Sequence, residues 1–318
     1  MSSSLKKKAV SGVAWTSISY FAQQIVQFII GVAIARILDP RDYGIIGMTA
    51  IFFAIATTFV NSGFGSALIQ NKNRNETDYA TCFYFNVLVG VLFYMILWFA
   101  SPYIAEFYRT PILKEVIRVL GLTLLINAMT VSQSARMTAE MRFKELAVIS
   151  LFTQLVTGAV GLILAYTGWG VWSLVFQQLS SCIIGSIILE FILKWYPQRA
   201  FSYASFKHMF SYGGKILCSS LINTIYDNLY TLVIGRAFSA KEVGYYNRGN
   251  QFSVLATNTI LSIFMKVAFP LMAEVQDDTE KLKGMLLLHL FHPIILHIFY
   301  HFLYIFENLL FAILHCLF

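Results

Sequence analysis

Residues 44–69 read GIIGMTAIFFAIATTFVNSGFGSALI and contain no charged side chain. An α-helix needs about 20 predominantly apolar residues to cross the hydrocarbon core of a bilayer, so this stretch predicts a transmembrane helix. Similar runs recur along the chain, without the alternation over about 10 residues that is typical of β-barrel strands. The predicted spans are 12–36, 44–69, 80–102, 115–135, 146–167, 170–193, 209–235, 248–272 and 285–315.

The composition of the whole chain agrees with this interpretation. Apolar residues make up 58% of the chain and charged residues 12%, and the mean hydropathy is +0.67. A soluble domain carries about 25% charged residues, so lipid must replace water around much of this chain. We therefore predict an all-α, polytopic transmembrane bundle of about nine spans. The four cysteines include no CxxC pair, which argues against a disulfide or zinc framework.

The net charge of +7 comes mostly from residues in the predicted loops. In a soluble protein this charge would suggest nucleic-acid binding, but in a membrane protein the Lys and Arg residues of loops set the orientation. With the N-terminus inside, thirteen such residues lie in cytoplasmic segments and eight at the outer ends. We therefore expect a cytoplasmic N-terminus, a retained first span instead of a cleaved signal peptide, and no nucleic-acid partner.

The chain resembles itself at an offset of 200 residues. Residues 11–62 then align with residues 211–262 without a gap, and ten of the 52 positions are identical. The aligned pairs include Arg36 with Arg236, Asp42 with Glu242, and Gly44 with Gly244. Because six spans separate the two starts, both copies have the same orientation, as in a parallel repeat. Shared membrane composition is the simpler alternative explanation.

The repeat predicts three regions. Residues 1–200 form a six-helix N-terminal lobe, residues 201–284 begin a second lobe with spans seven and eight, and residues 285–318 form a hydrophobic tail. The tail holds five of the six histidines, and Glu307 is its only charged residue. We expect an incomplete second lobe and an atypical or frameshifted tail. A histidine metal site is a less favoured alternative, since zinc would need further ligands fixed by a fold.

The residues around the first loop resemble those of a known family. The segment GVAIARILDPRDYGIIGMTAIFFAIATTFVNSGFGSALIQ (31–70) is similar to the start of Wzx-type polysaccharide flippases, which belong to the multidrug/oligosaccharidyl-lipid/polysaccharide exporter superfamily. Its pattern is an Arg, a Leu-Asp-Pro turn and an acidic residue followed by Tyr-Gly. The segment IGRAFSAKEVGYYNRG (234–249) resembles the start of their second lobe. The resemblance covers about residues 5–285.

The resemblance implies two lobes around a central cavity. It also implies transport of an undecaprenyl-diphosphate-linked oligosaccharide from the inner to the outer leaflet of the bacterial plasma membrane, for O-antigen, capsule or exopolysaccharide. The expected partners are the bilayer and polysaccharide polymerase or export machinery, and no catalytic residue, cofactor or metal is expected. The alternatives are a small-molecule exporter of the same superfamily, a non-functional remnant, and a membrane enzyme, which the absence of a large outer loop disfavours.

Polar residues inside the predicted spans are candidates for a substrate path. A diphosphate suits cationic side chains, and sugar hydroxyls suit amides, which donate and accept hydrogen bonds. The substrate-binding candidates are Gln23, Gln27, Lys215, Asn223, Asp227 and Lys266. The gate candidates are Arg36, Asp42, Arg236 and Glu242. The structural alternative is that the amides bond neighbouring helices and the arginines anchor helix ends at the membrane surface.

Overall fold

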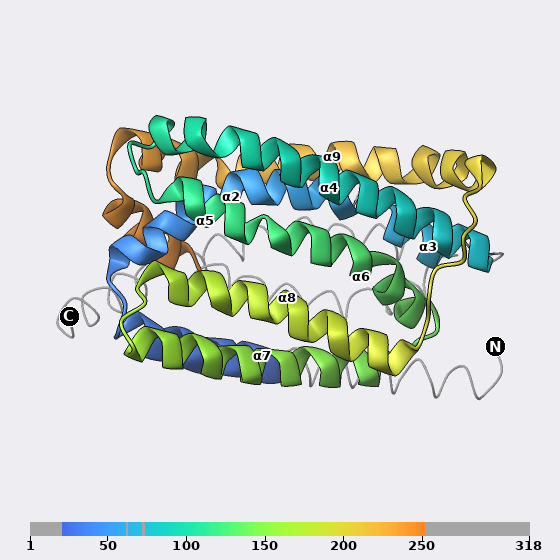
Figure 1. Cartoon of the computed structure of the whole chain (residues 1–318), viewed down its shortest axis with the longest axis horizontal. Helices are drawn as coiled ribbons and strands as arrows, with labels where there is room; N and C mark the ends of the chain where they lie inside the picture. Colours follow the sequence, from blue (N-terminus) through green and yellow to red (C-terminus); the bar gives the residue numbers. More distant parts are fainter. Residues whose placement is uncertain (1–20, 62, 72–73, 252–318) are drawn as a thin grey trace, which may run out of the picture. The chain divides into compact units, whose positions relative to one another are not determined.

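Figure 1 shows the computed structural model of the chain, which describes residues 21–61, 63–71 and 74–251. These residues are helical apart from short connections, and no strand occurs among them. The chain divides into two compact units, Met1–Tyr245 and Tyr246–Phe318. The predicted all-α class is therefore confirmed, and the architecture below is that of the first unit.

Eight labelled helices follow an initial helical stretch, Phe21–Ala35. They are α2 (Pro40–Asn61), α3 (Phe64–Gln70), α4 (Glu76–Phe107), α5 (Leu113–Leu120), α6 (Leu122–Ala139), α7 (Phe143–Tyr166), α8 (Val171–Leu193) and α9 (Tyr203–Ala237). After α9, a further helical segment begins at Ala240. The predicted spans 12–36 and 248–272 lie partly outside the described residues, and span 285–315 lies wholly outside them.

Five helical stretches of the described residues are long and apolar enough to cross a membrane. They are Pro40–Gln70, Glu76–Phe107, Leu113–Ala139, Phe143–Tyr166 and Val171–Leu193. They correspond to the second to sixth predicted spans, so the chain is a multi-pass membrane protein. The seventh predicted span is present as α9, which has 35 residues but is not among the five apolar stretches.

The second predicted span is broken between α2 and α3. Gly63 has a φ of 70°, a left-handed conformation that glycine adopts without steric cost. A Cβ atom added there would also lie 2.7 Å from the Cα atom of Gly213 in α9. The break therefore lets α9 approach the backbone of the α2–α3 connection closely.

Helix α4 continues past Pro102, although the sequence predicted that this span ends there. Proline lacks the amide that would bond the carbonyl of Trp98, four residues earlier. The Ser101 hydroxyl donates to that carbonyl at 2.8 Å, and Nε of Arg118 donates to the Ser101 oxygen at 3.1 Å. Because the freed carbonyl is satisfied within the protein, as a bilayer requires, the helix extends to Phe107.

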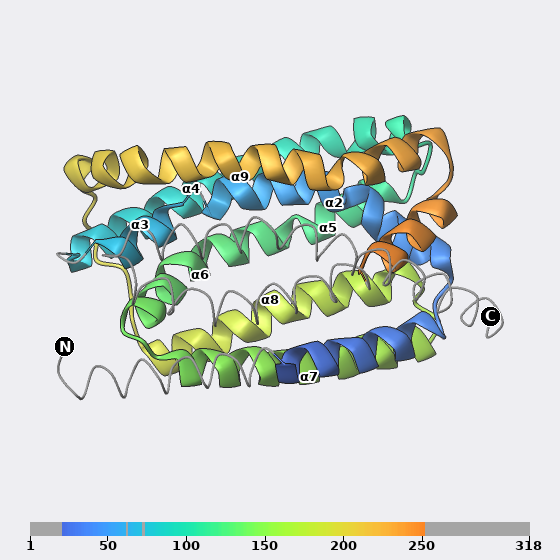
Figure 2. The same cartoon turned by 180° about the vertical axis from the view of Figure 1, so that it is seen from behind.

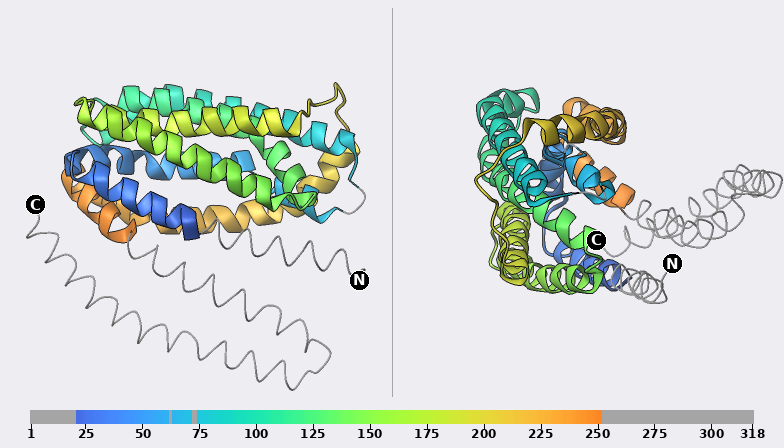
Figure 3. Two further views of the ribbon diagram at one scale, coloured as in Figure 1. Left: turned by 90° about the horizontal axis from the view of Figure 1, so that it is seen from below. Right: turned by 90° about the vertical axis from the view of Figure 1, so that its right-hand side faces the viewer.

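The helices pack in neighbouring pairs within the first unit. Helix α9 runs along α2, α4 lies beside α6, and α7 lies beside α8 (Figure 2). The helical stretch Phe21–Ala35 lies along α7 (Figure 3), where a Cβ atom added to Gly158 would meet the side chain of Ile30 at 2.1 Å. The amino-terminal stretch and α9 therefore pack on different partners, α7 and α2 respectively.

Candidate functional site

Helix α9 carries a polar edge along its exposed surface. Lys215, Ser219, Asn223 and Asp227 follow one another at a spacing of four residues, and all four are exposed. Side chains four residues apart lie above one another on a helix face, so the edge combines a cation, a hydroxyl, an amide and a carboxylate. The edge lies on the seventh predicted span, where an exposed charge would be costly if lipid faced it.

The other exposed edge of α9 is apolar. Ile222, Ile225, Leu229 and Val233 are between 46% and 69% exposed, and such side chains suit lipid or another apolar helix. The packed face is built from small or paired residues instead. Gly213, Thr231 and Gly235 are buried, and the Thr224 hydroxyl shares a hydrogen bond of 3.1 Å with Thr58 of α2. Because α9 packs through the face that carries Gly213, Thr231 and Gly235, its polar edge and its apolar edge stay exposed.

The predicted glutamines of the first span are on a different part of the bundle. The backbone carbonyl of Gln23 accepts a hydrogen bond from the Gln154 amide of α7 at 3.1 Å. Gln27 is exposed on the same helical stretch. The structure thus brings Lys215, Asn223 and Asp227 onto one edge of α9, while Gln23 and Gln27 lie on the stretch that packs on α7. Lys266 lies outside the described residues.

The four gate candidates are not ion-paired with one another in the part of the chain that the structure describes. In the described part of the chain, no ion pair joins Arg36 to Asp42 or Arg236 to Glu242. Arg36 is exposed, and the guanidinium of Arg236 lies 5.3 Å from the ring centroid of Phe107. The gating role of these residues stays a prediction.

The two acidic gate candidates have separate local partners. The Asp42 carboxylate lies beside the start of α8, where its two oxygens would be 3.4 and 3.6 Å from a Cβ atom added to Gly170. Glu242 accepts a hydrogen bond from the hydroxyl of Ser239. A carboxylate near a helix N-terminus is stabilised by free amides and by the helix dipole, so the start of α8 is a favourable place for Asp42.

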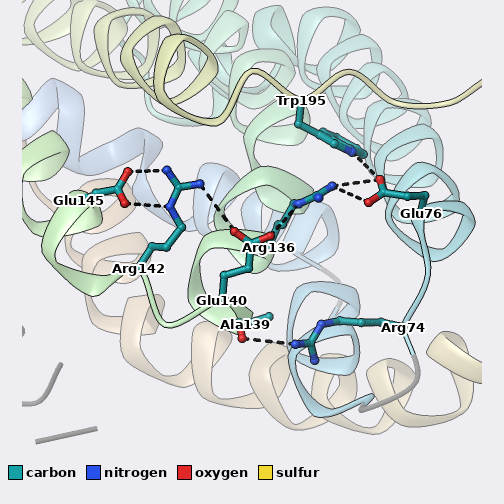
Figure 4. Close-up of polar contacts among 8 residues, drawn as sticks. All are labelled: Arg74, Glu76, Arg136, Ala139, Glu140, Arg142, Glu145 and Trp195. Carbon is teal, nitrogen blue, oxygen red and sulfur yellow. Dashed lines mark hydrogen bonds and ion pairs between the residues drawn. The ribbon is translucent and has the colours of Figure 1, made fainter. Parts of the chain in front are cut away.

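An ion-pair cluster at the opposite end of the bundle joins three segments (Figure 4). Arg136, in the last turn of α6, contacts Glu76 of α4 at 2.8 Å and Glu140 at 3.0 Å. The indole nitrogen of Trp195, which follows α8, donates to Glu76 at 2.8 Å. The Arg136 guanidinium also lies 5.4 Å from the ring centroid of Tyr79. Sequence reasoning missed this cluster, and only the four-residue spacing of Arg136 and Glu140 could have suggested part of it.

Two further arginines complete this end of the bundle. Arg142 is bonded to Glu145 through Nε at 2.8 Å and through a terminal nitrogen at 2.5 Å, and these bonds raise the pKa of Arg142. Arg74 donates to the carbonyls of Asn71 and Ala139, at 3.0 and 3.3 Å. The three arginines bond carboxylates and backbone carbonyls of the same chain, so we infer that the cluster holds neighbouring helices together.

The chain matches the family model described as polysaccharide biosynthesis protein over residues 33–296. It is 28% identical over 285 residues to the teichuronic acid biosynthesis protein TuaB of Bacillus subtilis, covering 88% of this chain and 58% of that protein. It is 25% identical over 286 residues to the lipopolysaccharide biosynthesis protein WzxC of Escherichia coli, covering 88% of this chain and 57% of that protein.

A third relative is the succinoglycan biosynthesis transport protein ExoT of Rhizobium meliloti, which is 22% identical over 283 residues. That alignment covers 89% of this chain and 57% of ExoT. No solved structure shows significant similarity to the chain.

These relatives confirm the resemblance to Wzx-type proteins. The alignments begin and end within proteins that are longer than this chain, which spans about 58% of the length of the curated relatives it matches. The family model covers most of the chain, including residues 33–70 and 234–249 of the two segments on which the resemblance rests. The chain belongs to the polysaccharide biosynthesis protein family of membrane proteins.

Proposed function

We propose that the chain functions in moving an undecaprenyl-diphosphate-linked oligosaccharide from the inner to the outer leaflet of the bacterial plasma membrane. The proposal is supported by the family match and by the names of WzxC and ExoT, which refer to lipopolysaccharide biosynthesis and succinoglycan transport. In this proposal the protein is a transporter and not an enzyme, and its N-terminus is cytoplasmic. Polysaccharide polymerase and export machinery are its proposed partners.

The polar edge of α9 is the observation that carries this proposal. A diphosphate carries negative charge and a glycan carries many hydroxyl groups, so neither enters hydrocarbon readily. Lys215 offers a cation for the diphosphate, and Ser219 and Asn223 offer donors and acceptors for hydroxyl groups. Asp227 can accept hydrogen bonds from sugar hydroxyls or bind a cation, such as a proton or Na⁺, if the transport is coupled to one. A path beside this edge would let the polar group cross while the lipid tail stays in the bilayer.

A complementation experiment tests the proposal. The chain is expressed in a bacterium whose own flippase of this family has been deleted, and surface glycan is measured by binding of a lectin or an antibody. We expect Asp227→Asn and Lys215→Ala each to reduce display by about tenfold or more, since each removes a charge from the path. Lys114→Ala is the matched control, because Lys114 is an exposed lysine that lies on α5 and not on α9.

The outcomes separate the proposal from its alternatives. Normal display with both Asp227→Asn and Lys215→Ala would remove the polar edge from the mechanism. Failure of the 318-residue chain itself to restore display, when it is present in the membrane, would favour a non-functional remnant. Restored resistance to small toxic compounds without glycan display would favour the small-molecule exporter.

A further inference from the structure

Two helix starts that are related by the internal repeat have the same capping geometry. Helix α2 begins directly after Asp39, whose carboxylate accepts a hydrogen bond from the Arg41 amide at 2.7 Å. The helical segment after α9 begins directly after Ser239, whose hydroxyl accepts one from the Lys241 amide at 3.2 Å. Each cap is therefore bonded by the amide two residues later, as expected for N-caps, and the two caps are 200 residues apart.

Two repeat-related glycines bring the first turns of these helices into backbone contact. A Cβ atom added to Gly44 would lie 1.5 Å from the carbonyl oxygen of Ala240. One added to Gly244 would lie 1.9 Å from the carbonyl oxygen of Pro40. Adding 200 to the residue numbers of the turn 40–44 gives those of the turn 240–244, so each glycine contacts the first residue of the other turn. The interface is therefore reciprocal, like that of a two-fold symmetric dimer. Any residue other than glycine at either position would push the two backbones apart.

The glycine contact lies in an apolar layer. Val243, from the second helix start, is fully buried in the same cluster as Ile45 and Met48 of α2 and Leu113 of α5. Gly235, at the end of α9, would meet the ring of Tyr108 at 2.7 Å if it carried a Cβ atom. A charged or hydroxylated group does not pass through such a layer without a large desolvation cost.

We propose that the Gly44–Gly244 contact is the closure point between the two repeats, and that it blocks a path along the polar edge of α9 at the bundle end where α2 begins. The path itself rests on the transport function proposed above. Closure is made by glycine backbones, because no ion pair among the described residues joins the gate candidates Arg36, Asp42, Arg236 and Glu242. Among the described residues no ion pair spans the contact, which is made by backbone atoms and apolar side chains such as Val243, so the two backbones can separate and close again.

A distance measurement tests the contact. All four cysteines are replaced in the 318-residue chain, and nitroxide labels are attached to Arg41→Cys and Lys241→Cys, two exposed positions beside the glycines. A methyl group on Gly44 needs about 2 Å of separation to reach ordinary contact at 3.4 Å. We therefore expect Gly44→Ala to lengthen the mean label distance in liposomes by about 2 Å, and Gly244→Ala, whose methyl group would lie 1.9 Å from the Pro40 oxygen, to lengthen it by about 1.5 Å.

Gly185→Ala is the matched control, because a Cβ atom there would make only an ordinary contact of 3.8 Å with Thr153. It should leave the label distance unchanged. An unchanged distance with either Gly44→Ala or Gly244→Ala would overturn the reciprocal contact, as would an equal lengthening with Gly185→Ala.

A labelling experiment tests the closure. Ser219→Cys places a thiol on the polar edge of α9 in the same cysteine-free chain, and a membrane-impermeant maleimide is added on the side where Arg41→Cys reacts. We expect Gly44→Ala to speed the labelling of Ser219→Cys about fivefold, since the rate follows the population of the open state. Equal rates with Gly44→Ala and Gly185→Ala would refute closure at the glycines.

Neither measurement depends on glycan export. If both give the expected results while complementation fails, the closure stands and the proposed transport function falls. If complementation succeeds while the label distance and the labelling rate do not change, transport stands and the glycine closure is refuted.

Discussion

Replacing Arg136 by Gln should destabilise the protein more than any other single change in the ion-pair cluster. Arg136 joins Glu76 of α4 and Glu140 at the end of α6, and it lies over two aromatic rings, at 5.4 Å from Tyr79 and 6.0 Å from Trp195. Its own side chain is 23% exposed, whereas those of Glu76 and Glu140 are 43% and 39% exposed. Solvent therefore screens both ion pairs.

The magnitude follows from these exposures. Partly exposed ion pairs contribute about 0.5 kcal/mol each, and cation–π contacts in similar surroundings contribute about 0.5 kcal/mol each. Loss of two pairs and two ring contacts amounts to about 2 kcal/mol. For a domain of this size, 1 kcal/mol lowers the unfolding midpoint by about 2–4 °C, so Arg136→Gln should lower it by about 4–8 °C.

The assay is thermal unfolding in a single detergent, followed by tryptophan fluorescence. Arg142→Gln is the control, because Arg142 bonds mainly Glu145, three residues away in the same helix turn. That change should lower the midpoint by only about 1–2 °C. A double-mutant cycle with Glu76→Gln should show coupling of about 0.5–1 kcal/mol with Arg136→Gln. Equal effects of the two arginines, or additive effects in the cycle, would refute the reasoning.

Three further changes have expected outcomes in the same unfolding assay. Phe64→Ala should lower the free energy of unfolding by about 3–4 kcal/mol, because Phe64 is fully buried and its ring stacks on that of Phe85 with the centroids 4.5 Å apart. Phe64→Leu should lower it clearly less. Asn75→Ala should cost about 1 kcal/mol, because it removes the capping box of α4, and an unchanged midpoint would contradict this. Ser101→Ala should cost about 1–3 kcal/mol, because it leaves the Trp98 carbonyl without a donor inside the membrane; Ser101→Thr, which keeps the hydroxyl, should largely restore the midpoint.

Helix positions were predictable from the sequence because a bilayer imposes a length and an apolar composition on every span. The predicted spans 146–167 and 170–193 correspond closely to α7 and α8. The start of a new helix shortly after Arg36 and again shortly after Arg236 was also predictable, because an arginine, turn residues, an acidic residue and a glycine occur in the same order at both places. These signals are local, and they do not depend on which helices become neighbours.

Features that depend on neighbouring helices were not predictable in this way. The continuation of α4 past Pro102 requires the hydroxyl of Ser101 and the guanidinium of Arg118 on another helix. The place of Asp42 beside Gly170 arises because α8 begins there, 128 positions later in the chain. The pairing of Glu76 with Arg136 joins residues 60 positions apart, for which a single sequence offers no signal.

Orientation in the membrane is a further property that packing does not determine. Within the described residues, Lys and Arg occur at both ends of the bundle, including Arg74 and Lys194 at one end and Arg109 and Lys241 at the other. The predicted bias towards a cytoplasmic N-terminus therefore depends on lysines outside the described part, such as Lys6, Lys7 and Lys8. Labelling of Arg74→Cys and Arg109→Cys from each side would decide the orientation, and it would also assign the glycine contact to one face of the membrane.

Different interactions hold the two ends of the bundle: ion pairs and hydrogen bonds at one end, and close backbone contact with apolar burial at the other. This difference determines which end can open more easily. The ion-pair cluster joins α4, α6 and the segment after α8, all within the first predicted lobe, through charged groups that need defined geometry. The Gly44–Gly244 contact joins the two repeats through backbone atoms and apolar burial, which tolerate separation better than hydrogen bonds do. A motion that opens a path along α9 would therefore keep the first lobe rigid and separate the repeats at the glycines.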